Sequence, residues 1–208
     1  EGSFYLYSLG SEYPIVELRY TAGLSNVLKS RYSYHKISGG ISDYTDIPPL
    51  GTLYYNAFAG RTFGTLPYML LDIAPGNELY YYNRYAFNLM NRYEYLHDRY
   101  AGINIEHNFG NGIFRFVPFM RKLKWRQFWT AKLLWGNLSD ENRTLNMPDT
   151  AVYKFETLNG RTYVELGTGI DNIFKLFRID LVWRVLPTPL PPESVRRFGV
   201  FFSFRLAF

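Results

Sequence analysis

Charged side chains of both signs occupy alternate positions close to the C-terminal end of the chain. Within 177–185, Arg178, Asp180 and Arg184 share one parity, and the residues between them are mostly apolar. Further charges on the polar parity of alternating segments are Glu17, Arg19, Arg92, Glu94, Glu106, Glu165 and Arg205. Mixed charges in a narrow space pair with one another, so we expect a salt-bridged plug. A lining that selects an anionic solute is the alternative.

Catalytic and metal-binding motifs are missing from the sequence. The chain has no cysteine, and His35, His97 and His107 lack the spacing of metal ligands. It contains no His-Glu-x-x-His and no Gly-x-Ser-x-Gly motif. Glu106 directly precedes His107, so a strand would place the two side chains on opposite faces. We therefore expect no enzymatic activity, no cofactor and no metal.

Apolar and polar residues alternate with a period of two along most of the chain, which predicts β-strands. The expected strands lie at 16–23, 31–37, 52–60, 85–95, 101–108, 128–136, 163–170, 177–185 and 198–208. Together they suggest about nine or ten strands and no long helix. Asp171-Asn172 predicts a tight turn, whereas 137–160 and the proline-rich 187–196 predict long loops. Segment 118–125 is expected to form a short helical turn.

The composition excludes several classes of protein. The 208 residues are 47% hydrophobic, which is too much for a disordered chain. No apolar stretch approaches the ~18 residues of a membrane-spanning helix. The net charge is +5, but lysine and arginine are scattered, so we expect no nucleic-acid partner. The densest basic cluster, at 121–126, is expected to face solvent or lipid headgroups.

Three features favour a β-barrel in a membrane over a soluble β-sandwich. The apolar parity is rich in bulky aromatics, and these residues make up 19% of the chain. The expected strands have about 10–12 residues, close to the ~9–11 that a tilted transmembrane strand needs. The opposite parity carries both signs of charge, as a lumen does. We expect residues 1–208 to form a single all-β domain, an antiparallel transmembrane barrel of the bacterial outer membrane.

The last strand resembles the signal that the barrel-assembly machinery reads in bacterial outer-membrane proteins. The pattern is polar–x–Gly–x–x–aromatic–x–aromatic, followed here by a terminal aromatic residue. The residues that match it are Arg197, Gly199, Phe202, Phe204 and Phe208. We expect the chain to be oriented in the membrane so that Phe208 and the Asp171-Asn172 turn face the periplasm and the long loops face outward.

Several unbroken stretches resemble one family of Bacteroidetes outer-membrane proteins. They are 85–109, 116–126, 165–184 and the closing FGVFFSFRLAF. Members pair a carboxypeptidase-regulatory-like domain with a C-terminal barrel of unknown function, which itself is distantly similar to surface-antigen barrels of the BamA and TamA type. The Val/Ile-Arg-Gly-Phe/Tyr motif of those barrels is absent from this sequence, and Gly60-Arg61-Thr62-Phe63 matches it poorly. The sequence therefore does not support an activity that inserts other proteins into the membrane.

The resemblance implies a function in transport or envelope assembly, without catalysis. A scaffold barrel with a plugged lumen and a soluble β-barrel that binds an apolar ligand are the alternatives. The expected partners are outer-membrane lipid, lipopolysaccharide, the assembly machinery and other envelope proteins. The chain is expected to be either the C-terminal part of a larger barrel or a short barrel of about eight to ten strands. Thr150, in Asp149-Thr150-Ala151, matches the Bacteroidetes O-glycosylation sequon.

Overall fold

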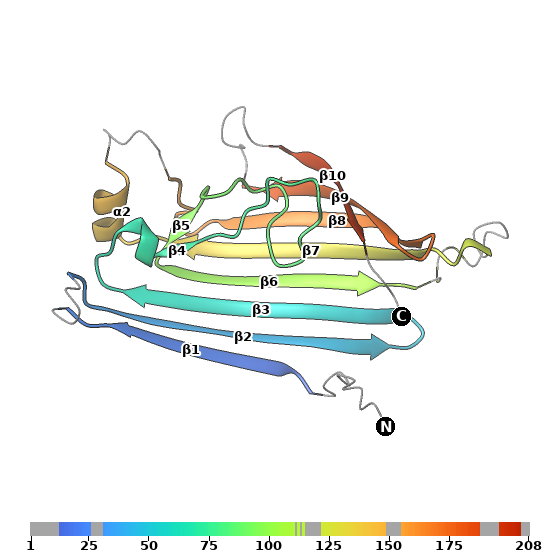
Figure 1. Cartoon of the computed structure of the whole chain (residues 1–208), viewed down its shortest axis with the longest axis horizontal. Coiled ribbons are helices and arrows are strands. Elements are labelled where there is room, and N and C mark those ends of the chain that lie inside the picture. The colour runs from blue at the N-terminus through green and yellow to red at the C-terminus, as the bar shows by residue number, and fades with distance from the viewer. Residues whose placement is uncertain are drawn as a thin grey trace, which may run out of the picture.

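The structure is a computed structural model that describes residues 13–25, 31–110, 112, 114, 122–148, 155–187 and 196–204. One eight-stranded antiparallel sheet dominates it (Figure 1). Its strands are β1 (Ile15–Gly23), β2 (Tyr34–Ile47), β3 (Gly51–Phe63), β6 (Arg99–Asn108), β7 (Arg126–Asn137), β8 (Thr162–Ile173), β9 (Phe177–Leu186) and β10 (Phe198–Phe204). The smaller elements are the 3-10 turn η1 (Tyr68–Leu70), the paired β4 (Asp72–Ile73) and β5 (Leu96–His97), and the helix α2 (Asp140–Asn146). The predicted antiparallel β-sheet is therefore confirmed.

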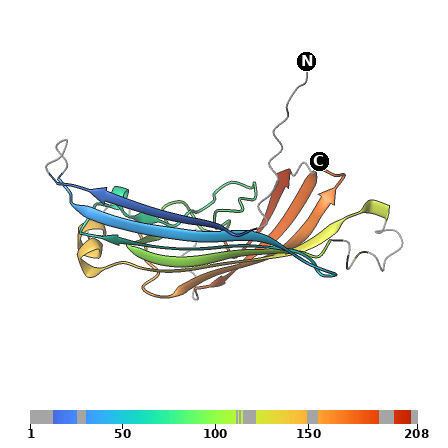
Figure 2. The same ribbon diagram turned by 90° about the horizontal axis from the view of Figure 1, so that it is seen from below.

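The strands pair with their neighbours along the chain of the sheet in the order β1-β2-β3-β6-β7-β8-β9-β10, so that each of the six inner strands has two partners and each edge strand has one. The short connections 48–50 and 174–176 lie at one end of the sheet. The long connections 64–98 and 138–161 leave from the opposite end, because consecutive strands run in opposite directions. Figure 2 shows that the sheet is curved and twisted, with β8–β10 turned away from the direction of β1–β3.

The sheet is open, so the expected closed barrel is not formed by these eight strands. β1 and β10 lie at its two edges and do not pair with each other. Part of the β10 edge pairs instead with residues from the β3–β6 connection. The Tyr82 amide donates to the Phe202 carbonyl at 3.0 Å, and the Phe202 amide donates to the Tyr80 carbonyl at 2.9 Å. The backbone groups of Phe202, which a neighbouring strand would bind in a closed barrel, are thus already paired with residues 80–82 of the same chain.

The two faces of the sheet differ in chemistry. Along β9, the residues Arg178, Asp180, Val182 and Arg184 are buried, and those between them are partly or fully exposed. We call the face that carries Arg178 the inner face and the opposite one the outer face. The exposed large residues of the outer face on β7–β10 are Trp129, Trp135, Leu166, Phe177, Trp183, Val185, Phe198, Phe202 and Phe204. A half-apolar, half-polar alternation along each strand produces this sorting.

The connection 64–98, which we call the inward segment, folds back over the inner face. In Figure 1 its loops lie in front of β7–β9. The apolar core lies between this segment and the sheet, where Phe87, Met90 and Tyr95 pack with Leu134 and Tyr163. A second cluster, formed with α2 and its surroundings, consists of Leu66, Leu71, Leu96, Leu138 and Phe155.

The inward segment corrects the strand expected at 85–95, which does not form. The reason lies in its asparagines, whose short side chains bond to nearby backbone and so compete with a strand ladder. The Asn88 side chain accepts from the Asn83 amide at 2.8 Å and donates to the Asn83 carbonyl at 3.1 Å. Asn77 likewise accepts from the amide of Leu79 at 3.0 Å. Its tyrosines, which suggested an outward strand face, lie on a coiled backbone.

Several boundaries also differ from the expectation. β8 continues to Ile173, so the turn lies at 174–176, and a register shift between Ile170 and Ile173 replaces the turn expected at Asp171-Asn172. The long loop 137–160 contains α2. Of the short helical turn expected at 118–125, residues 118–121 lie outside the described residues, and 122–123 are helical. Among the helices that the structure describes, none has both the length and the apolar character to span a membrane.

Candidate functional site: the charged inner face

Two deeply buried ion pairs of the inner face share Arg178 on β9. Its guanidinium lies 2.7 Å from an Asp180 carboxylate oxygen and 2.9 Å from a Glu106 oxygen. The guanidinium also stacks over the ring of Phe128, 3.7 Å from its centroid. Such bidentate, hydrogen-bonded pairing offsets part of the desolvation cost of burying these charges.

Two small residues, Thr130 of β7 and Gly167 of β8, lie beside Glu106 of β6 in the sheet register. In the sheet register Glu106 lies opposite Thr130, and Thr130 lies opposite Gly167. A Cβ atom at Gly167 would lie 2.4 Å from the Thr130 hydroxyl, so a larger residue would displace that side chain. The glycine at 167 therefore leaves room for the Thr130 side chain beside Glu106, while Phe128 of β7 lies against Arg178.

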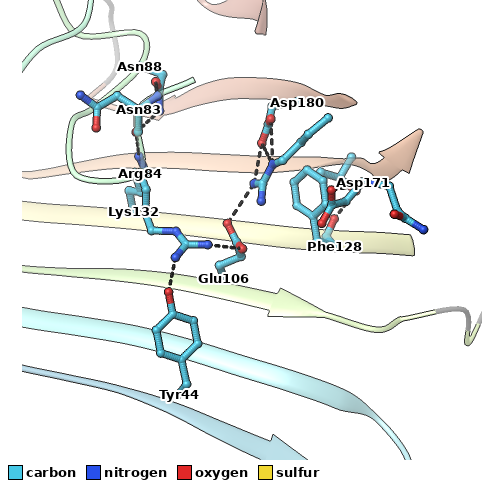
Figure 3. Close-up of polar contacts among 12 residues, drawn as sticks. Tyr44, Asn83, Arg84, Asn88, Glu106, Phe128, Lys132, Asp171 and Asp180 are labelled. Carbon is cyan, nitrogen blue, oxygen red and sulfur yellow. Dashed lines mark hydrogen bonds and ion pairs between the residues drawn. The ribbon is translucent and has the colours of Figure 1, made fainter. Parts of the chain in front are cut away.

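Arg84 joins the inward segment to this cluster. Its guanidinium lies 2.9 Å from the second Glu106 oxygen and donates a hydrogen bond to the hydroxyl of Tyr44 on β2. Figure 3 shows Arg84 between Tyr44 and Glu106. One continuous polar chain thus runs from β2 through the segment to β6 and β9.

Lys132 of β7 and Glu165 of β8 hold the next part of the segment. The Lys132 ammonium donates to the carbonyls of Asn83 at 2.7 Å and Ala86 at 2.5 Å. The Glu165 carboxylate accepts from the backbone amides of Asn88 at 2.9 Å and Leu89 at 2.7 Å. Because charge-assisted hydrogen bonds to backbone groups are strong, these two side chains of the sheet bind the main chain of the segment directly.

Arg184 of β9 holds the end of the same loop. Its guanidinium donates to Glu94 at 2.8 Å and to the Tyr95 hydroxyl at 2.7 Å, and it lies over the Tyr163 ring. Tyr82, between Arg178 and Lys132, is also buried. Burial and the nearby Asp180 raise the pKa of Tyr82, so its hydroxyl stays neutral.

Two further polar residues, His97 and Asp98, lie where the segment returns to β6. Asp98 accepts from the Ser139 amide at 2.8 Å and the Asn142 side chain at 3.0 Å. Burial works to raise the pKa of Asp98, but these hydrogen bonds outweigh it and hold that pKa below its usual value. His97 is 3% exposed, and burial lowers its pKa to about 4. It is therefore uncharged at neutral pH.

Some of the site residues predicted from the sequence lie in the part of the chain that the structure describes, and others lie outside it. Glu106, Glu165, Arg178, Asp180 and Arg184 share the buried inner face. The expected signal residues Gly199, Phe202 and Phe204 belong to β10, and Arg197 is exposed just before it. Arg205, Phe208 and Thr150 lie outside the described residues.

Two cations of the site were missed in the sequence. In the expected strand 128–136, Lys132 lies on the inner face, whereas Trp129 and Trp135 lie on the outer face. This alternation could have indicated that Lys132 points inward. Arg84 lies in irregular backbone, where no periodicity indicates a direction. In the part of the chain that the structure describes, no group of three or more His, Cys, Asp or Glu residues could hold a metal ion.

The arrangement defines a class of protein: an antiparallel sheet with an aromatic outer face, whose charged inner face is covered over β7–β9 by its own long connection. Residues 5–147 match the C-terminal domain of a family of unknown function, DUF5686, and the chain belongs to this family. No curated protein and no solved structure matches the chain.

Proposed function

We propose that the chain forms the wall of a bacterial outer-membrane β-barrel that works without catalysis and has an occluded lumen. The observation that carries this proposal is the contrast between an exposed aromatic outer face and a buried, ion-paired inner face. Contiguous apolar surface of this kind is unfavourable in water and favourable against acyl chains. A role in envelope structure or assembly fits an inner face that is filled by protein.

Closure of the barrel is part of the proposal. Open strand edges are not tolerated in lipid, because their backbone groups would lack partners. Additional strands would therefore pair with the edge at β1 and with the part of the β10 edge that Tyr80 and Tyr82 leave free, as in the larger barrels that the family resemblance implies. Outer-membrane lipid, lipopolysaccharide and the barrel-assembly machinery are the proposed partners.

Fluorescence quenching in vesicles tests the placement in lipid. A variant that keeps Trp183 and carries Phe at the other tryptophans is refolded into phosphatidylcholine vesicles with brominated acyl chains. We expect strong quenching of Trp183, and weak quenching of a matched variant whose single tryptophan is introduced by Leu50→Trp, in the turn 48–50. Equal, weak quenching of both, or a chain that stays folded and monodisperse in plain buffer, overturns the proposal in favour of a soluble β-protein.

A second candidate function is transport through a lumen that opens and closes. It is favoured because the element that fills the inner face is a connection between strands, which can move without breaking the sheet. Planar-bilayer recordings separate the two functions. The occluded scaffold predicts no steady conductance from the wild type or from the double variant Lys132→Met/Arg184→Met. Gated transport predicts that the double variant conducts, since loss of both cations removes the contacts of the sheet with the Asn83 and Ala86 carbonyls and with the side chains of Glu94 and Tyr95.

A further inference from the structure

A cavity of about 370 Å³ remains on the inner face beside the inward segment. It lies over the part of the sheet formed by β1–β3 and β6, with residues 72–97 of the segment on its other side. Its volume falls within the roughly 300–1,000 Å³ of small-molecule sites. The residues that carry the argument below are Ser38, Asn56, Asn104, Phe58, Tyr85 and Tyr100.

Glycines in the sheet allow two aromatic rings to lie close to its backbone on this part of the inner face. A Cβ atom at Gly60 would lie 2.6 Å from the Tyr100 hydroxyl, and one at Gly102 would lie 2.5 Å from the Phe58 ring. The Phe58 and Tyr100 rings are 6.3 Å apart. Since they lie close to the backbone, they leave room above them and present ring surface to it.

Uncharged hydrogen-bonding groups accompany these rings. Asn56 and Asn104 are direct partners across β3 and β6, and both line the cavity. Asn104 is 5% exposed, and within the described residues its Oδ1 has no hydrogen-bond partner. Buried acceptors without a partner are uncommon in proteins. A carboxamide both donates and accepts, so it suits a ligand whose hydroxyl groups do the same.

Charge around the cavity is balanced. Glu17 and Arg19 are exposed neighbours of opposite sign on β1. Asp72 is neutralised by Lys36, whose ammonium lies 2.6 Å from it. His97 is uncharged at neutral pH, as described above. The cavity therefore favours neither an anion nor a cation.

From these features we infer that the cavity binds a neutral saccharide. The flat apolar face of a sugar ring matches Phe58, Tyr100 and the exposed ring of Tyr85, and its hydroxyl groups match Asn56, Asn104 and Ser38. The inference goes beyond the proposed function, because it assigns a ligand class to the part of the inner face that the ion pairs leave free. It depends on the cavity and not on insertion into lipid, so the two proposals can fail separately.

Calorimetric titration of the full chain in micelles of a detergent without sugar tests the inference. The probes are maltose and cellobiose, with glucose 6-phosphate and glucosamine as charged comparators. We expect saturable binding of at least one neutral disaccharide with a Kd of about 1 mM or tighter, and binding of the charged comparators at least about tenfold weaker. Absence of binding by both disaccharides, or equal binding of the charged sugars, overturns it.

Two variants tie the binding to this cavity. Tyr85 is 65% exposed, so Tyr85→Ala leaves the fold intact, and we expect about a tenfold loss of disaccharide affinity. Its control is Tyr81→Ala, an exposed tyrosine of the same segment outside the cavity lining. Asn104→Leu should lose affinity to a similar degree, and Asn108→Leu, on the same strand and face, should keep it. Wild-type affinity in Tyr85→Ala overturns the inference even where Asn104→Leu fails to fold.

Discussion

The two halves of the sheet use the same alternation of residues and reach opposite states on their inner faces. On β7–β9 the inner charges are buried and paired beneath the inward segment, as Arg178 and Glu165 illustrate. On β1, Glu17 and Arg19 occupy the equivalent parity and remain exposed. The alternation thus determines the faces, but a distant connection determines which inner charges are desolvated.

This difference also separates the core from the cavity. The clusters that contain Phe87 and Leu89 pack on the inner faces of β7–β10. The cavity lies over the other half, beside Ser38 and Asn56. Stability should therefore depend on the β7–β9 half, whereas ligand contact should depend on the β1–β3 half.

Removal of a buried cation should give the largest effect. Arg178→Met leaves Asp180 and Glu106 without their shared partner, and we expect a loss of about 3–5 kcal/mol in unfolding free energy. Arg19→Met, on the exposed half, should change it by less than about 0.5 kcal/mol. Urea unfolding of the refolded chain in detergent measures both. Comparable losses in the two variants would remove the distinction between the halves.

A charge on the outer face of β9 should have the next largest effect. Leu181 alternates with the buried Asp180 and Val182, so Leu181→Arg should cost about 2–4 kcal/mol in vesicles if it lies near the bilayer midplane. Leu50→Arg, in the turn 48–50, should be nearly neutral. Unfolding in urea from vesicles provides the measurement, and a near-zero cost for Leu181→Arg contradicts its contact with acyl chains.

The strands could be predicted where apolar residues on one face alternate with charged residues on the other. β9 alternates Phe177, Ile179 and Leu181 with charged residues, and both its limits and its buried parity follow from that pattern. β2 was recognised only at its start, because Gly39 and Gly40 interrupt the alternation in its middle. The strand signal is therefore strongest where bulky and charged residues alternate without glycine.

The inward segment could not be predicted, because its fold depends on the sheet beneath it. Residues 85–95 alternate well enough to suggest a strand, yet Lys132 and Glu165 bind their backbone groups at points that no local pattern marks. Closure failed as an expectation for a related reason. The bridge between Tyr81 and Phe202 joins residues that are far apart in the chain.

Acid should weaken the junction between the segment and the sheet through His97. Its pKa is lowered from 6.5 to about 4 in the folded chain, so between these values the unfolded chain binds more protons. Stability is unaffected above pH 6.5 and falls as the pH decreases toward 4, by up to about 3 kcal/mol. His97→Gln should flatten this part of the pH profile, and the exposed His35→Gln should not. An unchanged profile in His97→Gln contradicts the role of His97.

The ion pair between Lys36 of β2 and Asp72 of β4 should give the smallest effect. It ties the segment to the exposed half of the sheet at 2.6 Å, but the two side chains keep 26% and 15% of their surface accessible. Water and salt screen such a pair, so Lys36→Met should cost about 1 kcal/mol or less, and the difference should shrink in high salt. Urea unfolding at low and high ionic strength measures it. A loss as large as that of Arg178→Met would mean that both halves grip the segment equally, and the cavity beside it would then belong to a rigid core.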